Sequence, residues 1–233
     1  MIRNILFTIF FFLGIVLISL VFLPTLIMPP STTLFGGKIM GHWTKYCLWI
    51  FLSVKVNIIG KENIITNEKF FIACSHQSMF ETFVLQTIFN APVFILKKEL
   101  LKIPIFGLYL KKIGSISINR NKTTKENLGF LEEIKKKVIN SKRPLLIFPQ
   151  GTRLLPNERS KFKKGTSRIY ETLKIKCQPV AINSGYVWPK NGQLSTNKTI
   201  TVSVLKQIDT NLNKENFLDK LEKDIYFELD RIS

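Results

Sequence analysis

The start of the chain contains almost no charge. No charged residue lies between Arg3 and Lys38, and the first acidic residue is Glu62. As a helix, residues 5–23 would be roughly 28 Å long, close to the thickness of the bilayer hydrocarbon core. A cleavable signal peptide is the alternative, but such peptides end in small residues, and the first alanine is Ala73. The sequence therefore predicts that the chain begins with a membrane helix.

A second apolar stretch, residues 40–54, follows the first after a break. Pro24, Pro29 and Pro30 predict the end of the first helix, and Gly36-Gly37 is expected to allow the chain to reverse. This second stretch mixes aromatic and basic residues, which is typical of the headgroup boundary. We therefore interpret residues 1–56 as a membrane-anchoring helical hairpin. Because basic residues greatly favour the part that follows, we expect the main domain on the cytoplasmic side of the cytoplasmic membrane.

Residues 57–233 alternate short β-rich runs with helical ones. This alternation predicts an α/β domain in which helices flank a central mixed sheet. Seven runs are candidate strands: 54–59, 70–75, 92–96, 115–118, 145–148, 179–183 and 199–205. The predicted fold is thus a hydrophobic two-helix anchor followed by one α/β domain.

Two helices of this domain can be predicted from apolar stripes. Thr123 to Glu126 is typical of a capping box, and the stripe that follows it is Leu128, Leu131, Ile134 and Val138. Leu218, Leu221, Ile225 and Leu229 repeat the same spacing near the end of the chain. We expect a helix at each place.

The charge of the chain indicates an anionic partner. The net charge is +18, and residues 97–176 hold 21 Lys and Arg against 6 Asp and Glu, a net of +15. Such a surface attracts phosphates, anionic lipid or acidic proteins. Nucleic acid is not expected, because no nucleic-acid-binding motif accompanies the charge. The three cysteines lack disulfide or zinc-site spacing, which favours a reducing environment and predicts no metal site.

Only two histidines exist, and one of them has a carboxylate nearby in the sequence. His76 directly follows a candidate strand, and Glu81 lies five positions later. Residues five apart in a regular helix point about 140° away from each other. If His76 precedes the helix and Ser78 lies near its N-cap, however, the turn can fold the imidazole back toward Glu81. The pair would then be a catalytic dyad, although a lone histidine hydrogen-bonded at a helix start would show the same spacing.

Further segments accompany His76 in a recognisable order. His76 to Glu81 resembles an H-x4-D motif with Glu in place of Asp, and Phe148 to Arg153 reads Phe-Pro-Gln-Gly-Thr-Arg, where Gln150 replaces a Glu. The other matching segments are Gly114 to Arg120, Lys163 to Gly165 and Gln178 to Ala181. In this combination the sequence resembles the 1-acyl-glycerol-3-phosphate acyltransferases, the lysophosphatidic acid acyltransferase family.

The resemblance implies a membrane-bound enzyme of phospholipid synthesis. Its reaction would move a fatty acyl group from acyl-CoA or acyl carrier protein to the free hydroxyl of 1-acyl-glycerol-3-phosphate, which gives phosphatidic acid. His76 would be the general base and Glu81 would orient it. The residues expected to bind the substrate are Gly114, Arg120, Gln150, Gly151, Thr152 and Arg153. The resemblance implies neither a metal nor a bound cofactor.

The chemistry of these residue types agrees with that reaction. Two guanidinium groups, from Arg120 and Arg153, can grip one phosphate from different sides. Gly151 would let the backbone approach the ligand, and Thr152 adds a hydroxyl donor. No G-x-S-x-G segment is present, so direct transfer is expected rather than an acyl-enzyme.

Several alternatives stay open at this point. Gln150 removes a negative charge, so another lysophospholipid or a lyso-aminolipid remains a possible acceptor. The same base could activate water, which would make the protein a thioester or lysolipid hydrolase. A non-catalytic protein that binds the membrane surface would need only the basic and apolar residues. Chain-length preference and oligomeric state have no signal in the sequence.

Overall fold

The predicted strands form one mixed sheet in a computed structural model that describes residues 1–118 and 128–233. The strands are β1 (Lys55–Ile59), β2 (Phe70–Cys74), β3 (Val93–Lys97), β4 (Ile116–Ile118), β5 (Leu145–Ile147), β6 (Lys176–Ile182) and β7 (Thr199–Val204). Their order across the sheet is β1-β7-β6-β2-β5-β3-β4. Within the described part of the chain, neighbouring strands are parallel except β6 and β7. Each prediction is confirmed, although β6 begins three residues earlier than expected.

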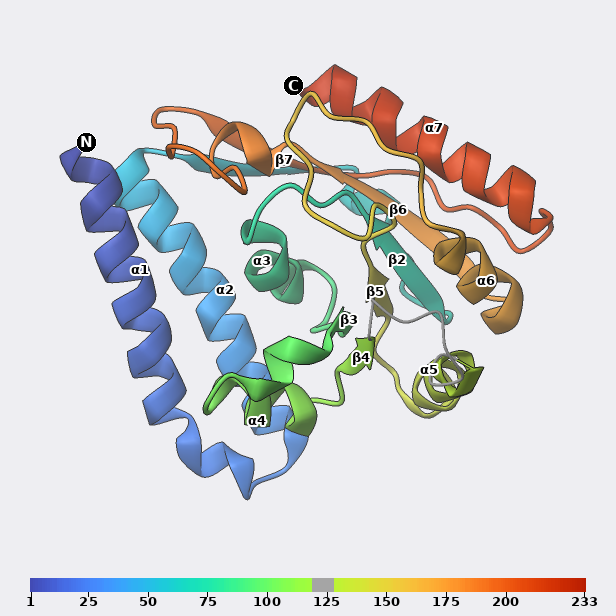
Figure 1. Cartoon of the computed structure of the whole chain (residues 1–233), viewed down its shortest axis with the longest axis horizontal. Coiled ribbons are helices and arrows are strands. Elements are labelled where there is room, and N and C mark those ends of the chain that lie inside the picture. The colour runs from blue at the N-terminus through green and yellow to red at the C-terminus, as the bar shows by residue number, and fades with distance from the viewer. Residues whose placement is uncertain (119–127) are drawn as a thin grey trace.

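Helices cover both faces of this sheet (Figure 1). One face carries α1 (Ile2–Val21), α2 (Pro30–Leu52) and α3 (Phe80–Ile88), and the other carries α5 (Leu128–Asn140), α6 (Lys164–Leu173) and α7 (Lys214–Ile232). The shorter elements are α4 (Phe106–Lys112) and the 3-10 turns η1 (Leu23–Leu26), η2 (Lys61–Asn63), η3 (Lys98–Lys102) and η5 (Ser184–Tyr186). The predicted fold class, a mixed sheet flanked by helices after a hydrophobic hairpin, is confirmed.

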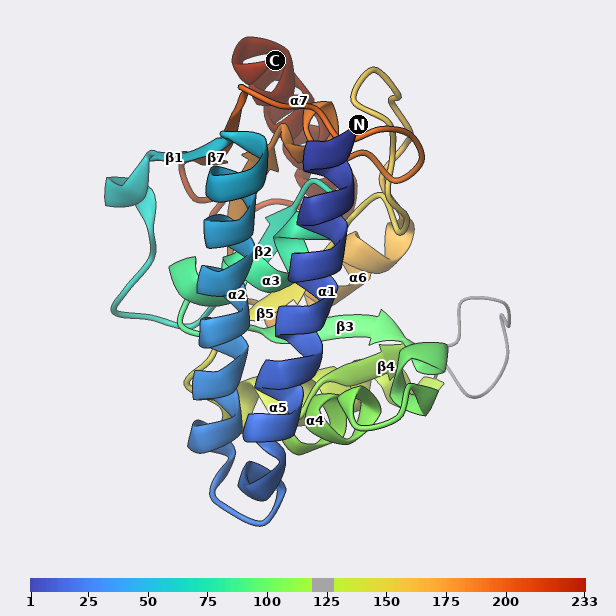
Figure 2. The ribbon, with the colours of Figure 1, turned by 90° about the vertical axis from the view of Figure 1, so that its left-hand side faces the viewer.

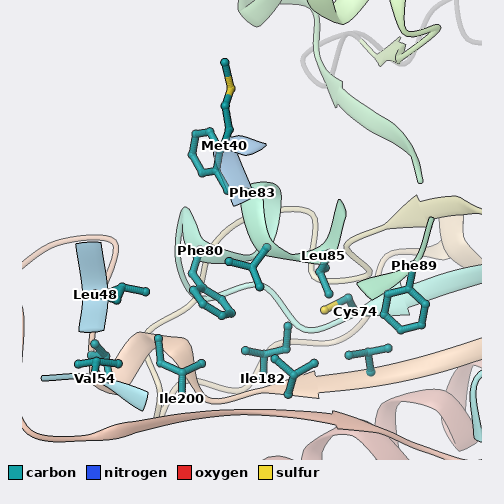
Figure 3. Packing of buried hydrophobic residues seen from close by; sticks show 14 of the residues in the cluster. Met40, Leu48, Val54, Cys74, Phe80, Phe83, Leu85, Phe89, Ile182 and Ile200 are labelled. Atoms are coloured by element: carbon teal, nitrogen blue, oxygen red, sulfur yellow. The ribbon is translucent and has the colours of Figure 1, made fainter. Parts of the chain in front are cut away.

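Alternation along the strands builds a hydrophobic cluster on each face. In β2, Ile72 and Cys74 point into the cluster under α1 to α3, whereas Phe71 and Ala73 point into the cluster under α5 to α7. Both sets are fully buried, as a parallel strand covered on both faces requires. Figure 3 shows side chains of α2 and α3 packed on the strands in the first cluster. The end of β2 is therefore held firmly from both sides.

The N-terminal hairpin reverses at a different place from the one expected. Helix α1 ends at Val21, η1 carries Pro24, and α2 begins at Pro30, so the prolines end the first helix as predicted. The expected reversal at Gly36-Gly37 is wrong, because both glycines lie inside α2. A Cβ at Gly36 would lie 2.6 Å from the Phe22 ring. This glycine therefore serves close packing rather than a turn.

Helix α1 lies along the rest of the molecule rather than projecting from it (Figure 2). Near its start, Arg3 Nε donates to the Phe51 carbonyl at 2.7 Å; near its end, the Ser19 carbonyl accepts from the Tyr109 hydroxyl at 2.5 Å. Between these points Phe11 is fully buried against Phe83 and Trp188. The hairpin and the sheet thus share one apolar cluster.

The other face of α1 is exposed and apolar. Ile5, Ile9, Val16 and Leu17 are each at least half exposed. Among the helices that the structure describes, α1 is the one whose length and composition would allow it to cross a membrane, with a mean hydropathy of 2.6. Of the two helices in the predicted anchor, only this one is a candidate span. The division of the chain at residue 56 stays a prediction.

The two helices that were predicted from apolar stripes are also present. α5 begins at Leu128, and Ile134 and Val138 of its stripe are buried. The capping box predicted at Thr123 to Glu126 lies outside the described residues. In α7, Leu221, Ile225 and Leu229 are buried as expected.

We expect Phe11→Ala to lower the free energy of unfolding by about 3–5 kcal/mol, because it opens a cavity between α1 and the α/β layers. Leu17→Ala, on the exposed face of the same helix, should cost about 1 kcal/mol or less. Denaturant unfolding of the purified protein in detergent measures both. Equal losses for the two variants would contradict the packing of α1 on the domain.

Candidate active site

His76 lies where β2 leaves the sheet. The amide of Ser75 still donates to the Val180 carbonyl of β6, at 3.0 Å. One residue later, the His76 amide donates to the Gln150 side-chain oxygen at 3.2 Å, and the His76 carbonyl accepts from the Leu154 amide at 3.0 Å. The backbone of His76 is therefore fixed by the loop that follows β5, and its side chain, 14% exposed, reaches the surface.

Glu81 lies in the first turn of α3 and is completely buried. Its Oε2 accepts from the Ser78 amide at 3.1 Å, and its Oε1 accepts from the Gln77 amide at 3.2 Å. The Ser78 hydroxyl accepts from the Phe80 amide at 3.1 Å. The contact from the Ser78 amide is one half of a capping box, and it folds the carboxylate back over the start of its own helix. The Ser78 hydroxyl takes the Phe80 amide rather than that of Glu81. This confirms the predicted place of Ser78 near the N-cap.

The turn brings His76 and Glu81 together. Nδ1 of His76 lies 3.4 Å from Oε2 of Glu81. Nδ1 is buried, and it forms no well-aligned hydrogen bond within the part of the chain that the structure describes. Such contacts often tighten only when substrate binds. The predicted approach of the imidazole to the carboxylate is present, so Nδ1 faces an acceptor that can hold one tautomer.

Phe148 fixes the plane of the imidazole. Its ring stacks on His76, with the ring centroids 3.9 Å apart and an angle of 14° between the planes. Phe148 directly follows β5, and β5 pairs in parallel with β2. The two rings therefore leave neighbouring strands at the same edge of the sheet. The sequence singled out Phe148 only as part of a motif and not as a partner of the histidine.

The remaining residues of the Phe-Pro-Gln-Gly-Thr-Arg segment lie in the loop after β5. Gln150 is 2% exposed, and its side-chain oxygen accepts a hydrogen bond from the His76 amide. Gly151 has a φ of +73°, which favours glycine, and a Cβ there would meet the Lys163 side chain at 3.3 Å. Thr152 is exposed and Arg153 is half-buried. Arg153 forms no ion pair with the residues that the structure describes, so its charge is available to a ligand.

Of the two residues predicted from the Gly-to-Arg segment, the structure describes only Gly114, and it does not lie at this site. Gly114 lies between α4 and β4, at the amino end of β4, whereas His76 and Gln150 lie beyond the carboxyl ends of parallel strands. Its φ of +76° makes it a residue of the turn. The expectation that Gly114 contacts the substrate is therefore not supported by its position. Arg120 lies outside the described residues.

Neither a reactive cysteine nor a metal-binding cluster lies near His76 in the described part of the chain. Burial, together with the nearby Glu81 carboxylate, raises the pKa of the Cys74 thiol well above its ordinary value, so this thiol stays neutral. Residues 1–118 and 128–233 contain no group of three or more His, Cys, Asp or Glu side chains that could hold a metal ion. The groups that the structure does bring together here are a base and its carboxylate, His76 and Glu81.

Two residues that complete the site gave no signal in the sequence analysis. The Ser184 hydroxyl, from η5 after β6, donates a short hydrogen bond to Glu81 Oε1. The neighbouring Gly185 amide donates to the Gln77 side-chain oxygen at 3.0 Å. Since β6 is parallel to β2, its carboxyl end lies at the same edge of the sheet, so the strand order rather than any local motif brings these residues to the site.

We expect Gln150→Ala to lower the free energy of unfolding by about 1–3 kcal/mol, because the His76 amide then loses its acceptor. Gln150→Glu keeps an acceptor oxygen at the same place and should cost less. Thermal or denaturant unfolding of the two variants makes the comparison. A larger loss in Gln150→Glu than in Gln150→Ala would contradict this role.

Comparisons with known proteins agree with the geometry. The Acyltransferase family model matches residues 55–183, more than half of the chain. The 1-acyl-sn-glycerol-3-phosphate acyltransferase of Pseudomonas aeruginosa is 30% identical over 169 residues, which cover 71% of this chain and 65% of that protein. That of Saccharomyces cerevisiae is 32% identical over 202 residues, which cover 82% and 66%. The chain thus spans just under two thirds of the length of these relatives.

The fold has a solved counterpart. The crystal structure of the 1-acyl-sn-glycerophosphate (LPA) acyltransferase PlsC from Thermotoga maritima matches with a TM-score of 0.80. The match covers 100% of this chain and 98% of that one at 21% sequence identity, so it shows a shared fold. With the family model, these findings confirm the resemblance on which the site residues were chosen: the chain belongs to the acyltransferase family.

Proposed function

We propose that this chain is a 1-acylglycerol-3-phosphate O-acyltransferase. It would move a fatty acyl group from an acyl thioester to the free hydroxyl of 1-acyl-glycerol-3-phosphate and so form phosphatidic acid. The observation that carries the proposal is the His76 imidazole beside the buried Glu81, at the edge of the sheet where the loop with Arg153 lies. The names of the relatives support the acceptor.

His76 is the general base in this proposal. With a proton on Nδ1, facing Glu81, its Nε2 takes the proton of the acceptor hydroxyl. The hydroxyl oxygen attacks the thioester carbonyl, and the resulting oxyanion collapses as the thiolate leaves. The thiolate then takes the proton back from the imidazolium, which restores the base. Glu81 offsets the positive charge of the imidazolium while it lasts.

Arg153 holds the phosphate of the acceptor. It is half-buried, has no ion pair among the described residues, and follows a glycine that lets the backbone come close to a ligand. A guanidinium binds a phosphate through two parallel hydrogen bonds. Arg120 is proposed as its partner from the sequence alone. The exposed hydroxyl of Thr152 would add a donor.

Gln150 contributes differently from the family's glutamate. Its carbonyl oxygen accepts from the His76 amide, so a contact to the substrate would come from its amide nitrogen. That group is a donor, whereas a carboxylate would accept from the hydroxyls of glycerol. This substitution leaves another lysophospholipid or a lyso-aminolipid as the second class of acceptor.

The acyl donor is proposed to be acyl-CoA or acyl carrier protein. Both are anionic, and exposed lysines lie at the carboxyl end of β3, at the same edge as His76. Lys97 ends the strand, and Lys98 and Lys102 follow it in η3. Membrane association would come from the exposed apolar face of α1. The excess of basic residues after the hairpin supports a catalytic domain on the cytoplasmic side of the membrane.

The proposal predicts that acyl transfer depends on both acceptor and His76. Purified protein with a labelled acyl thioester should consume it only when 1-acyl-glycerol-3-phosphate is supplied, and the label should appear in phosphatidic acid. His76→Ala should lower kcat by about 10²–10⁴-fold, because proton transfer to a positioned base is lost. Thin-layer or mass-spectrometric analysis of the products makes the measurement.

A panel of lysolipid acceptors separates the alternatives. Release of free fatty acid without any acceptor would identify a hydrolase. Preference for a lyso-aminolipid would show that the acceptor belongs to that class and is not 1-acyl-glycerol-3-phosphate. Activity that survives His76→Ala would overturn the general base. A burst of covalent acyl-protein would contradict direct transfer.

Arg153→Ala should act on acceptor binding rather than on the chemical step. We expect KM for 1-acyl-glycerol-3-phosphate to rise by about 10-fold or more, because a charged hydrogen bond is worth about 1.5–3 kcal/mol, while kcat changes less. Arg168→Ala, which removes an exposed arginine from α6, is the matched control. Steady-state kinetics with varied acceptor measures both, and equal KM values would contradict the assignment.

A further inference from the structure

The buried carboxylate of Glu81 is held by two different parts of the molecule. The Gln77 and Ser78 amides belong to its own turn and would move with it. The Ser184 hydroxyl comes from η5, more than 100 positions later in the chain, and donates to Oε1. Ser184 therefore connects the carboxylate to the end of β6.

Ser184 is itself fixed in place. It is completely buried, and its carbonyl accepts from the Val187 amide at 3.1 Å and from the Trp188 amide at 2.8 Å. The strand before it is tied to the end of β2, because the Ile182 amide donates to the Ser75 hydroxyl at 2.8 Å. The hydroxyl of Ser184 thus reaches Glu81 from a rigid support on the sheet.

The adjacent glycine, Gly185, keeps η5 close to the turn that carries His76. The Gly185 amide donates to the Gln77 side chain at 3.0 Å, and a Cβ on Gly185 would lie 3.0 Å from both Gln77 and Pro156. A side chain at residue 185 would therefore push η5 away from the turn that carries His76. The close approach lets a short side chain such as serine reach the carboxylate.

The two oxygens of Glu81 consequently have separate partners. Oε1 accepts from Ser184 and Gln77, whereas Oε2 accepts from Ser78 and faces Nδ1 of His76 at 3.4 Å. A carboxylate with one oxygen anchored from outside its own turn cannot rotate freely. Ser184 supplies that outside contact, on the oxygen opposite the one that faces the imidazole.

We propose that Ser184 is a positioning residue of the acyl transfer reaction: its hydroxyl holds the Glu81 carboxylate so that the second oxygen faces His76. Ser184 touches neither the substrate nor the reacting atoms, and it acts through Glu81. This inference rests on the proposed function of the His76 and Glu81 pair. It assigns a role to the segment after β6, to which no motif in the sequence points.

The test is a double-mutant cycle with Ser184→Ala and Glu81→Gln. Ser184→Ala should lower kcat by about 10- to 100-fold, the effect of a lost hydrogen bond to a charged group, while KM for the acceptor stays within about two-fold. In the Glu81→Gln background, Ser184→Ala should lower kcat further by less than about two-fold. Effects that act through one residue are not additive.

A matched control is available on the other face of the sheet. Ser203 of β7 is also buried and also donates a short hydrogen bond to a glutamate, Glu228 of α7. Ser203→Ala removes the same kind of contact and should leave kcat unchanged. Ser184→Cys, which keeps the side-chain size but has a weak donor, should lower kcat in the same direction as Ser184→Ala. Unfolding midpoints of all variants report on stability separately.

The outcomes distinguish the two proposals. If Glu81→Gln lowers kcat but Ser184→Ala and Ser184→Cys do not, the dyad stands and the role of Ser184 is wrong. A fully additive loss in the double variant also overturns it, because Ser184 would then act independently of Glu81. If Glu81→Gln leaves kcat unchanged, both the dyad and the role of Ser184 are overturned.

Discussion

The site depends on one buried anion. Glu81 is completely removed from solvent at the start of α3, where an unpaired carboxylate would cost several kcal/mol. Two backbone amides, one hydroxyl and the positive end of the helix offset that cost. The chain must therefore form the tight turn after β2, and this turn places His76 beside the carboxylate. The contacts that make the burial possible also build the proposed base.

The sheet supplies the other side chains because its central strands run in parallel. The carboxyl ends of β2, β5 and β6 lie at one edge, and the segments that follow them carry His76, Phe148 with Gln150, and Ser184. Each segment is far from the others in sequence, yet each needs only one to three residues beyond its strand to reach the site. Ligand sites at this edge are the general rule for open α/β sheets.

The local features of the fold could be predicted from the sequence, and the close contacts could not. Strands and striped helices carry their periodicity in short windows, so all seven strands were found. The turn at His76 could be predicted because residues five apart in a regular helix point away from each other, so His76 can approach Glu81 only from outside the helix. Gly36 was misread because a glycine that allows close packing looks the same in sequence as one that allows a turn. Ser184 and the stacking of Phe148 on His76 were missed because nothing local marks a contact made across the sheet.

The packing of α1 bears on what this apolar helix does in the molecule. Phe7 and Phe11 of α1 meet the Trp188 ring edge-on, at 5.1 and 5.0 Å between ring centroids. The Trp188 amide donates to the carbonyl of Ser184, whose hydroxyl holds Glu81. A helix that served only as a tether would need no buried face, because lipid solvates its apolar residues equally well. Since α1 instead buries aromatic side chains against the segment that anchors Glu81, the apolar cluster beneath the hairpin also supports the site.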